Sequence, residues 1–430
     1  MYILYPFYTP SGKQRRFFTR AMSTTSTELQ VPRTVPRKEP KRVEKSQLKV
    51  FSQWLFDNQA SLSFKLIAPF LLAHAYVPAA QPYTSRFFSL SYYNPRTDKY
   101  GTGPSDLCFV ATCIVLCIGV RAAIMQHVLE PLARRLGVAK DKDVTRFAEQ
   151  SWMLVYYSVA WPLGVYLYCQ SPYFLNLGGL WEGWPHKEID GLMKLYISVQ
   201  WAYWMQQLIV VNIEARRKDY LEMMFHHIVT ITLITASYAY HLTRVGHLIL
   251  VLMDVVDLIL PLAKCFKYLG STTVCNALFG VFLFTWALTR HVLYLMVCWS
   301  FYYDLPQVVK VPCYKGIADD LQGPFDAPGD GSRSYLLEPF YDPAGTVCLT
   351  DGIRTGFFTF LMGLELVICA WSFLILRVIA RMMKGSGAED VRSDDEGEVE
   401  AKEKKKKCVA KGVELKKAGR VGATGRRRHA

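Results

Sequence analysis

Long apolar runs recur along this 430-residue chain and alternate with short polar segments. A helix needs about 20 predominantly apolar residues to cross a bilayer, and eight runs approach or exceed that length. The pattern therefore predicts an all-α integral membrane protein, a polytopic bundle of about eight transmembrane helices. The first run is the weakest, because Lys65, His74 and two prolines interrupt it. The runs lie near residues 62–80, 106–128, 151–169, 193–212, 223–241, 246–266, 274–300 and 355–379.

Basic residues gather in every second segment between these runs, and this alternation predicts the orientation of the bundle. Cytosolic loops of membrane proteins carry an excess of Lys and Arg, whereas the long segment 301–352 is acidic. We therefore expect both termini and the "RRK" segment at 216–218 to be cytosolic, and 301–352 to be luminal. The basic residues concerned are Arg134, Arg135, Lys140, Lys142, Arg146, Arg216, Arg217, Lys218, Lys264, Lys267, Arg377, Arg381 and Lys384.

Composition supports the membrane class, since 51% of the residues are hydrophobic and 14% are aromatic. The formal charge of +14 belongs to the two ends of the chain. Residues 1–50 hold eleven Lys/Arg against three Asp/Glu, and residues 381–430 hold fifteen against nine, which leaves the middle neutral. Basic ends on a neutral apolar body are typical of membrane-flanking segments, so no nucleic-acid partner is expected.

The ends of the chain differ from its apolar body. We expect residues 1–60 to form a basic, largely disordered cytosolic region, 61–144 to hold the first two transmembrane helices and a cytosolic loop, and 383–430 to be a disordered charged tail. The first two dozen residues also have the Arg-rich, acid-poor composition of a mitochondrial presequence, and Met22 is an alternative start. Ser393 precedes three acidic residues and is a candidate phosphorylation site, although a solvated charge run is the plainer interpretation. The basic end of the tail suits anionic lipid headgroups or retention in the endoplasmic reticulum.

Ionisable side chains inside the runs are the candidate functional residues, because burying charge in a bilayer is costly. For each of them, a structural hydrogen bond inside the bundle is the alternative. His226 heads a polar stripe on run 223–241, whereas His227 points about a quarter-turn away, so their roles should differ. Asp254 and Asp257 are three residues apart and share a face of run 246–266. Run 274–300 and the last run add Trp286, Arg290, His291 and Glu365.

Two of the eleven cysteines stand apart from the others. Cys313 and Cys348 lie in a polar, Pro/Gly-rich loop and form a candidate disulfide if that loop faces an oxidising lumen. Most of the others lie inside apolar runs, where cysteine behaves as a small hydrophobe. The sequence has no CxxC pair and no zinc-site spacing, so no metal site is expected.

The motif inventory narrows the chemistry. The chain lacks the HxxxH and HxxHH boxes of di-iron enzymes and elongases, and it has no GxSxG elbow, P-loop or HExxH motif. Histidine with carboxylate, without metal or activated serine, suits proton transfer or histidine-carried acyl transfer. We therefore expect a membrane-embedded transfer to a lipid acceptor.

Residues 216–269, "RRKDYLEMMFHHIVT" through "VVDLILPLAKCFKYL", resemble the signature of the longevity-assurance family of ceramide synthases. An HH pair, an Asp-x-x-Asp and a Trp-x-x-x-Arg-His follow in the family's order, and the family's TLC domain would cover roughly 145–382. The loop between the first two runs is too short for the homeobox-like insert of many animal members. With its basic N-terminal extension, the chain looks most like the fungal members.

This resemblance implies an acyl-CoA-dependent sphingosine N-acyltransferase, a multi-pass protein of the endoplasmic reticulum membrane without a cofactor. The acyl group would pass from acyl-CoA to the amine of a sphingoid base, dihydrosphingosine or phytosphingosine, which gives a ceramide and free CoA. Fungal relatives also imply a small single-span regulatory subunit, and a homo- or hetero-dimer is a further candidate state. The implied catalytic residues are His226, His227, Asp254 and Asp257. From their charge and position we further expect Arg216, Arg217 and Lys218 to attract the phosphates of CoA, and Trp286, Arg290 and His291 to bind substrate.

Our mechanistic hypothesis gives His226 the attack on the thioester or the removal of the amine proton. Asp254 or Asp257 would orient an imidazole, and His227 would position the thioester or pass on the proton. Other TLC-domain proteins bind lipids or assist the translocon, so the fold alone does not establish an enzyme. A proton-coupled transporter is disfavoured, because the sequence shows no inverted repeat.

Overall fold

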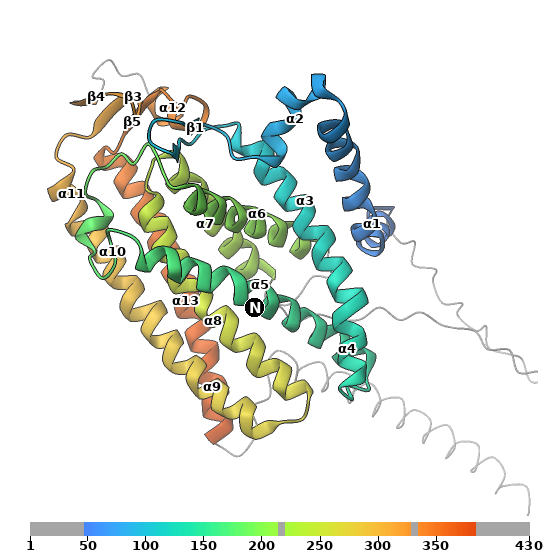
Figure 1. The fold of residues 1–430 in the computed structure, drawn as a ribbon. Helices are drawn as coiled ribbons and strands as arrows, with labels where there is room; N and C mark the ends of the chain where they lie inside the picture. Colours follow the sequence, from blue (N-terminus) through green and yellow to red (C-terminus); the bar gives the residue numbers. More distant parts are fainter. Residues whose placement is uncertain (1–46, 214–219, 328–333, 384–430) are drawn as a thin grey trace, which may run out of the picture.

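The computed structural model describes residues 47–213, 220–327 and 334–383 (Figure 1). Within them the chain is mainly helical, and its short strands lie in the loops at one end. Three groups of predictions fall outside the described residues: those for 1–46 and 384–430, the candidate site Ser393, and the segment that holds Arg216, Arg217 and Lys218. Residues 47–60, expected to belong to a largely disordered region, are helical instead, because they form the first turns of a helix that continues into the apolar run.

The N-terminal helices stand at the edge of the molecule (Figure 1). Helix α1 (Gln47–Tyr76) and helix α2 (Gln81–Phe88) meet at a bend of 112° around a 3-10 turn (Pro78–Ala80), so the first predicted span is broken. Helix α3 (Asp106–Ile124) continues through a π-turn (Met125–Leu129) into α4 (Glu130–Arg135). Helix α1 packs on α3, and α3 packs in turn on α6.

The remaining long helices form a ring. In order around it, α5 packs on α6, α6 on α7, α7 on α13, α13 on α10, α10 on α8, and α8 on α5. The tight turn from α8 to α9 depends on Gly270, whose φ of 77° is left-handed and suits glycine after a helix end. The helices are α5 (Asp141–Cys169), α6 (Gly191–Ile213), α7 (Tyr220–Ala239), α8 (Thr243–Tyr268), α9 (Thr272–Trp286), a π-turn (Ala287–Leu293), α10 (Tyr294–Tyr303) and α13 (Asp351–Met383).

Four described helices are long and apolar enough to cross a membrane, and the bent α1–α2 pair would be a fifth. Helices α5, α6 and α7 coincide with predicted runs but are not in this group. Their buried polar residues, which include Gln200, Gln206 and Gln207 on α6, lower their hydropathy while facing the interior. The total of eight spans therefore stays a prediction. The four are Asp106–Arg135, Thr243–Tyr268, Thr272–Val308 and Asp351–Ala380.

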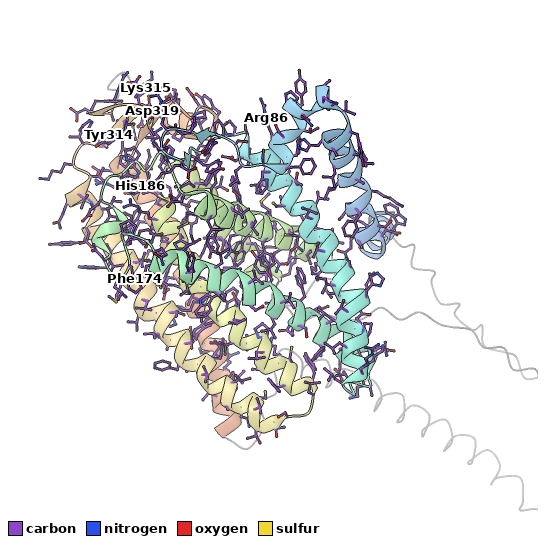
Figure 2. The ribbon with its side chains drawn as sticks, in the orientation of Figure 1. Arg86, Phe174, His186, Tyr314, Lys315 and Asp319 are labelled. Carbon is purple, nitrogen blue, oxygen red and sulfur yellow. A yellow bond between two sulfur atoms is a disulfide. The ribbon has the colours of Figure 1, made fainter. Side chains whose placement is uncertain are left out.

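The loops at one end of the ring fold together into a cap, which we define as residues 89–105, 170–190, 309–327 and 334–350 (Figure 1, top). In Figure 2 the labelled side chains Tyr314, Lys315 and Asp319 lie on this cap. A disulfide joins Cys313 to Cys348 across two paired strands. The strands are β1 (Tyr93–Asn94), β2 (Lys99–Tyr100), β3 (Cys313–Ile317), β4 (Asp320–Phe325) and β5 (Thr346–Cys348), and the short helices are α11 (Leu305–Val308) and α12 (Glu338–Tyr341).

The buried side chain of Lys194 bonds both the cap and the helices below it. Lys194, at the start of α6, places Nζ 2.7 Å from Oδ1 of Asp106 at the start of α3. The same ammonium donates to the carbonyl oxygens of Ser91 (2.8 Å) and Gly101 (2.7 Å) in the cap. Because a buried charge is tolerated only with such partners, this contact fixes the cap against α3 and α6.

Candidate active site

A cavity lies inside the helical ring. Every helix of the ring contributes to its wall, and most of the lining side chains are aliphatic or aromatic. A few polar groups project into this apolar space, which is the usual composition of a ligand site. One side chain from each wall is Tyr157 on α5, Trp204 on α6, His226 on α7, Asp257 on α8, Arg290 on the π-turn and Trp371 on α13.

Both predicted histidines line this cavity, in different states. The ring of His226 lies edge-on between Trp204 and Trp371, with centroids 5.3 and 5.0 Å away. Its Nδ1 is buried and has no hydrogen-bond partner among the described residues. His227 is 2% exposed, and its Nδ1 donates to the carbonyl oxygen of Met223 at 2.6 Å. The neutral His227 ring therefore carries its lone pair on Nε2.

The two predicted aspartates have different surroundings. Asp257 lines the cavity, with Oδ2 3.7 Å from Nη2 of Arg290. Asp254 is fully buried, lies outside the cavity lining, and accepts a hydrogen bond from Nε2 of Gln200. Positions three apart on a helix differ by about 60°, which is enough to turn Asp254 toward α6. Among the described contacts neither carboxylate orients an imidazole, so the expected aspartate–histidine pair is not present.

Arg290 brings a buried cation to the cavity wall. Its Nη2 donates to the carbonyl oxygen of Met253 at 2.6 Å, and its guanidinium carbon lies 5.1 Å from the ring centroid of Trp286. The Nε atom is buried without a hydrogen-bond partner in the described part of the chain. Since an unmade hydrogen bond from a buried donor is costly, Arg290 is suited to bind an oxygen of a substrate.

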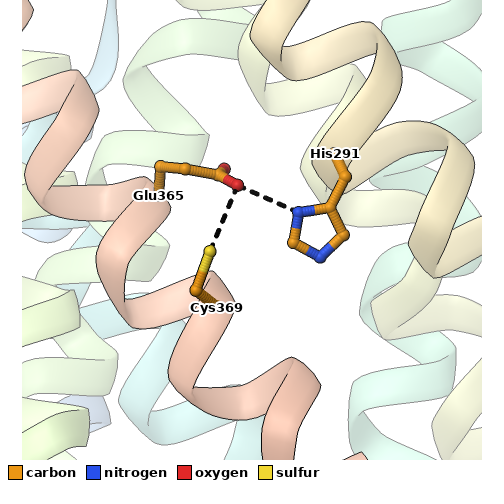
Figure 3. A group of neighbouring side chains, drawn as sticks. All are labelled: His291, Glu365 and Cys369. Atoms are coloured by element: carbon orange, nitrogen blue, oxygen red, sulfur yellow. Dashed lines mark hydrogen bonds and ion pairs between the residues drawn. The ribbon is translucent and has the colours of Figure 1, made fainter.

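His291 is not among the residues that line the cavity. Figure 3 shows it facing Glu365 on α13 instead, with Nδ1 2.9 Å from Oε1. Its Nε2 lies 2.7 Å from Oγ of Ser372. Sγ of Cys369 lies 3.6 Å from the same Glu365 oxygen. Among the described residues, His291, Glu365 and Cys369 are the one group with the spacing of metal ligands. The group lies behind the wall of the cavity.

Residues 146–377, more than half of the chain, match the family model described as the TLC domain. The chain belongs to the TLC-domain family. Its cavity and both histidines lie within the matched TLC-domain residues.

Several curated TLC-domain relatives have similar sequences over most of their length. Ceramide Synthase FUM18 of Gibberella moniliformis is 46% identical over 360 residues, which are 83% of each chain. Sphingosine N-acyltransferase lag1 of Schizosaccharomyces pombe is 34% identical over 75% of this chain and 76% of its own. Ceramide synthase LAG1 of Saccharomyces cerevisiae is 31% identical over 75% of this chain and 72% of its own.

The TLC-domain cavity also contains residues that the sequence analysis missed. Trp204 and Trp371 enclose His226, and Gln207 and Tyr157 add neutral polar groups to the wall. Gln207 could have been found from the sequence, because an uncharged polar residue inside an apolar run also needs a hydrogen-bond partner. Trp204 and Trp371 could not have been found in this way, since aromatic residues are common in any apolar run.

Proposed function

We infer that this chain is a ceramide synthase, which transfers a fatty acyl group from acyl-CoA to the amine of a sphingoid base. The products are a ceramide and free CoA. The names of relatives that match over about three quarters of the chain or more support this function. The observation that carries it is the pair of buried histidines in the wall of an apolar cavity. A lipid chain fits the apolar walls, and an imidazole is the side chain best suited to move a proton near neutral pH.

We assign His226 the reacting imidazole, because its Nδ1 has no described hydrogen bond that would have to break. Along one route this imidazole attacks the thioester carbon, the C–S bond breaks, and the CoA thiolate leaves with the proton that the acylated ring gives up from its other nitrogen. The amine then attacks the acyl-imidazole and regenerates the free ring. Along the other route His226 takes the amine proton while the amine attacks the thioester directly. By either route the acyl group ends on the amine nitrogen of the sphingoid base.

The other polar residues of the wall assist this transfer. Asp257 attracts the protonated amine of the sphingoid base, and Arg290 donates to the oxygen on which charge develops. His227, held by its bond to Met223, presents Nε2 as a fixed acceptor for a proton or a hydroxyl group. Asp254 lies behind the wall, where its hydrogen bond from Gln200 fixes α8 against α6. The reaction needs no cofactor.

We propose that the end of the ring opposite the cap faces the cytosol. CoA would enter there, beside the Arg216, Arg217 and Lys218 segment, whose positive charge attracts phosphate groups. Both termini would then be cytosolic, and the cap and its disulfide would lie in the oxidising lumen of the endoplasmic reticulum. Eight spans, a small single-span subunit and a dimer are further proposals that fit this orientation.

The test is N-acylation of dihydrosphingosine by membranes that contain this chain, across a panel of acyl-CoA lengths. We expect dihydroceramide from the wild type and none above background from an equally abundant His226→Ala/His227→Ala variant. Activity of both proteins above background would exclude the histidine mechanism. If the wild type makes no ceramide, with or without a small partner subunit, it would instead be a lipid-binding member of the family.

A further inference from the structure

The π-turn between α9 and α10 sends two adjacent side chains to different helices. Arg290 turns into the cavity and bonds the carbonyl oxygen of Met253 on α8. His291 turns away from the cavity and bonds Glu365 and Ser372 on α13 (Figure 3). A π-turn is rare and occurs often at functional sites. Here the π-turn connects α8, through Arg290, with α13, through His291.

Ser372 connects three groups behind the cavity wall. The Ser372 hydroxyl lies 2.9 Å from the carbonyl oxygen of Ile368, which can accept its single proton. The Ser372 oxygen accepts from Nε1 of Trp286 at 2.9 Å. Nε2 of His291 lies 2.7 Å from the same oxygen, and it either donates to this oxygen or accepts the hydroxyl proton. In either case Nδ1 of His291 and Oε1 of Glu365, 2.9 Å apart, share a proton.

This network ends at the reacting histidine. Ser372 directly follows Trp371, whose ring contacts His226 edge-on with centroids 5.0 Å apart. Trp286, the other donor to Ser372, lines the cavity beside Arg290. Two walls of the cavity are thus joined behind it by Ser372 and His291. A rotation of α13 would break these bonds and move Trp371 away from His226.

We propose that His291 is a positioning residue for the transferase reaction. Its bonds to Glu365 and Ser372 hold α13 in the rotation that sets Trp371 against His226. The inference rests on the proposed function, because it concerns the alignment of the imidazole that reacts. A misplacement of about 1 Å in such a site can cost roughly 100-fold in rate, so the network acts on kcat more than on substrate binding.

The test compares variants of the purified full-length protein, assayed per amount of monodisperse enzyme. We expect His291→Leu and Glu365→Leu to lower kcat by at least about tenfold, with KM for acyl-CoA changed by less than about threefold. Glu365→Gln should keep kcat within about threefold of wild type, because its amide can donate to Nδ1 of a neutral His291. Cys369→Ala, in the same cluster, is the matched control and should leave both constants unchanged.

A double-mutant cycle adds a readout that does not depend on one variant. Ser372→Ala and His291→Leu should not be additive in kcat, because they break the same bond. Three results would overturn the inference: full kcat in His291→Leu, an equal loss in Glu365→Gln and Glu365→Leu, or additive losses in the cycle. A wild type that makes no ceramide would overturn the proposed function as well, whereas an active wild type with insensitive variants would overturn this inference alone.

Discussion

Phe357 lines the cavity near the cap, and its truncation tests whether that end limits the acyl chain. Its ring centroid lies 5.6 Å from that of Tyr240 and 6.2 Å from that of Phe301. Tyr240 follows His226 by 14 residues, a rise of about 20 Å at 1.5 Å per helical residue. An acyl group bound at His226 therefore has an apolar path toward the cap, and Phe357 lies at its far end.

The expected effect of Phe357→Ala follows from the space it opens. If the cavity gains room for about two methylene groups, each worth about 0.8 kcal/mol when buried, the longer chain gains about 1.6 kcal/mol. This is a roughly 15-fold rise in kcat/KM for an acyl-CoA two carbons longer than the wild-type optimum, relative to that optimum. The truncation should also cost about 3–5 kcal/mol of stability, so only folded protein is compared.

The assay is a competition between acyl-CoA lengths, with the ceramide products separated by mass. Phe360→Ala is the matched control, since Phe360 lies on the same helix but is 40% exposed and does not line the cavity. Its length profile should equal that of the wild type. An unchanged profile in monodisperse Phe357→Ala protein would refute the idea that the acyl chain extends to the cap.

Three further predictions follow from the cap and the histidine pair. Burial lowers the pKa of His186 from 6.5 to about 4, with a smaller effect of the Arg244 charge. The folded state then keeps His186 neutral while the unfolded state is protonated below pH 6.5, so stability falls between pH 6.5 and 4, by at most about 2 kcal/mol at pH 5. Thermal unfolding should show this fall, and His186→Gln should reduce it. Removing the disulfide with Cys313→Ala/Cys348→Ala opens a loop of 35 residues, and we expect a loss of about 3–4 kcal/mol, seen as faster proteolysis of the cap; unchanged proteolysis would contradict it. If the covalent route holds, His227→Ala incubated with acyl-CoA alone should gain the mass of one acyl group, and His226→Ala should not.

The positions of the helices could be predicted well from the sequence, because apolar runs of membrane length are a strong signal. The helix bounds fall within a few residues of most predicted runs. The prolines of the first run suggest a bend after α1, but the angle of this bend cannot be predicted from them. Closure of the ring could not be predicted, since α7 meets α13 through packing between residues far apart in the chain.

The candidate site could be predicted only in part, because the direction of several side chains depends on tertiary packing. His226 and His227 could be found because buried ionisable groups are rare in apolar runs. The direction of His291, away from the cavity, depends on the π-turn, which changes the helical phase locally and leaves no mark in the apolar pattern. Asp254 and Asp257 share a helix face, but which of them meets the cavity depends on the rotation of α8 against α5 and α6. That rotation is set by tertiary contacts such as Gln200 with Asp254.

The central claim is that His226 is the reacting imidazole of a ceramide synthase. The most direct test is single-turnover N-acylation by purified wild type, His226→Asn and His227→Asn proteins, with acyl-CoA binding measured in parallel. We predict that His226→Asn binds acyl-CoA as the wild type does but transfers the acyl group at least about 100-fold more slowly, with a larger loss than His227→Asn. Transfer by His226→Asn at the wild-type rate would contradict the account.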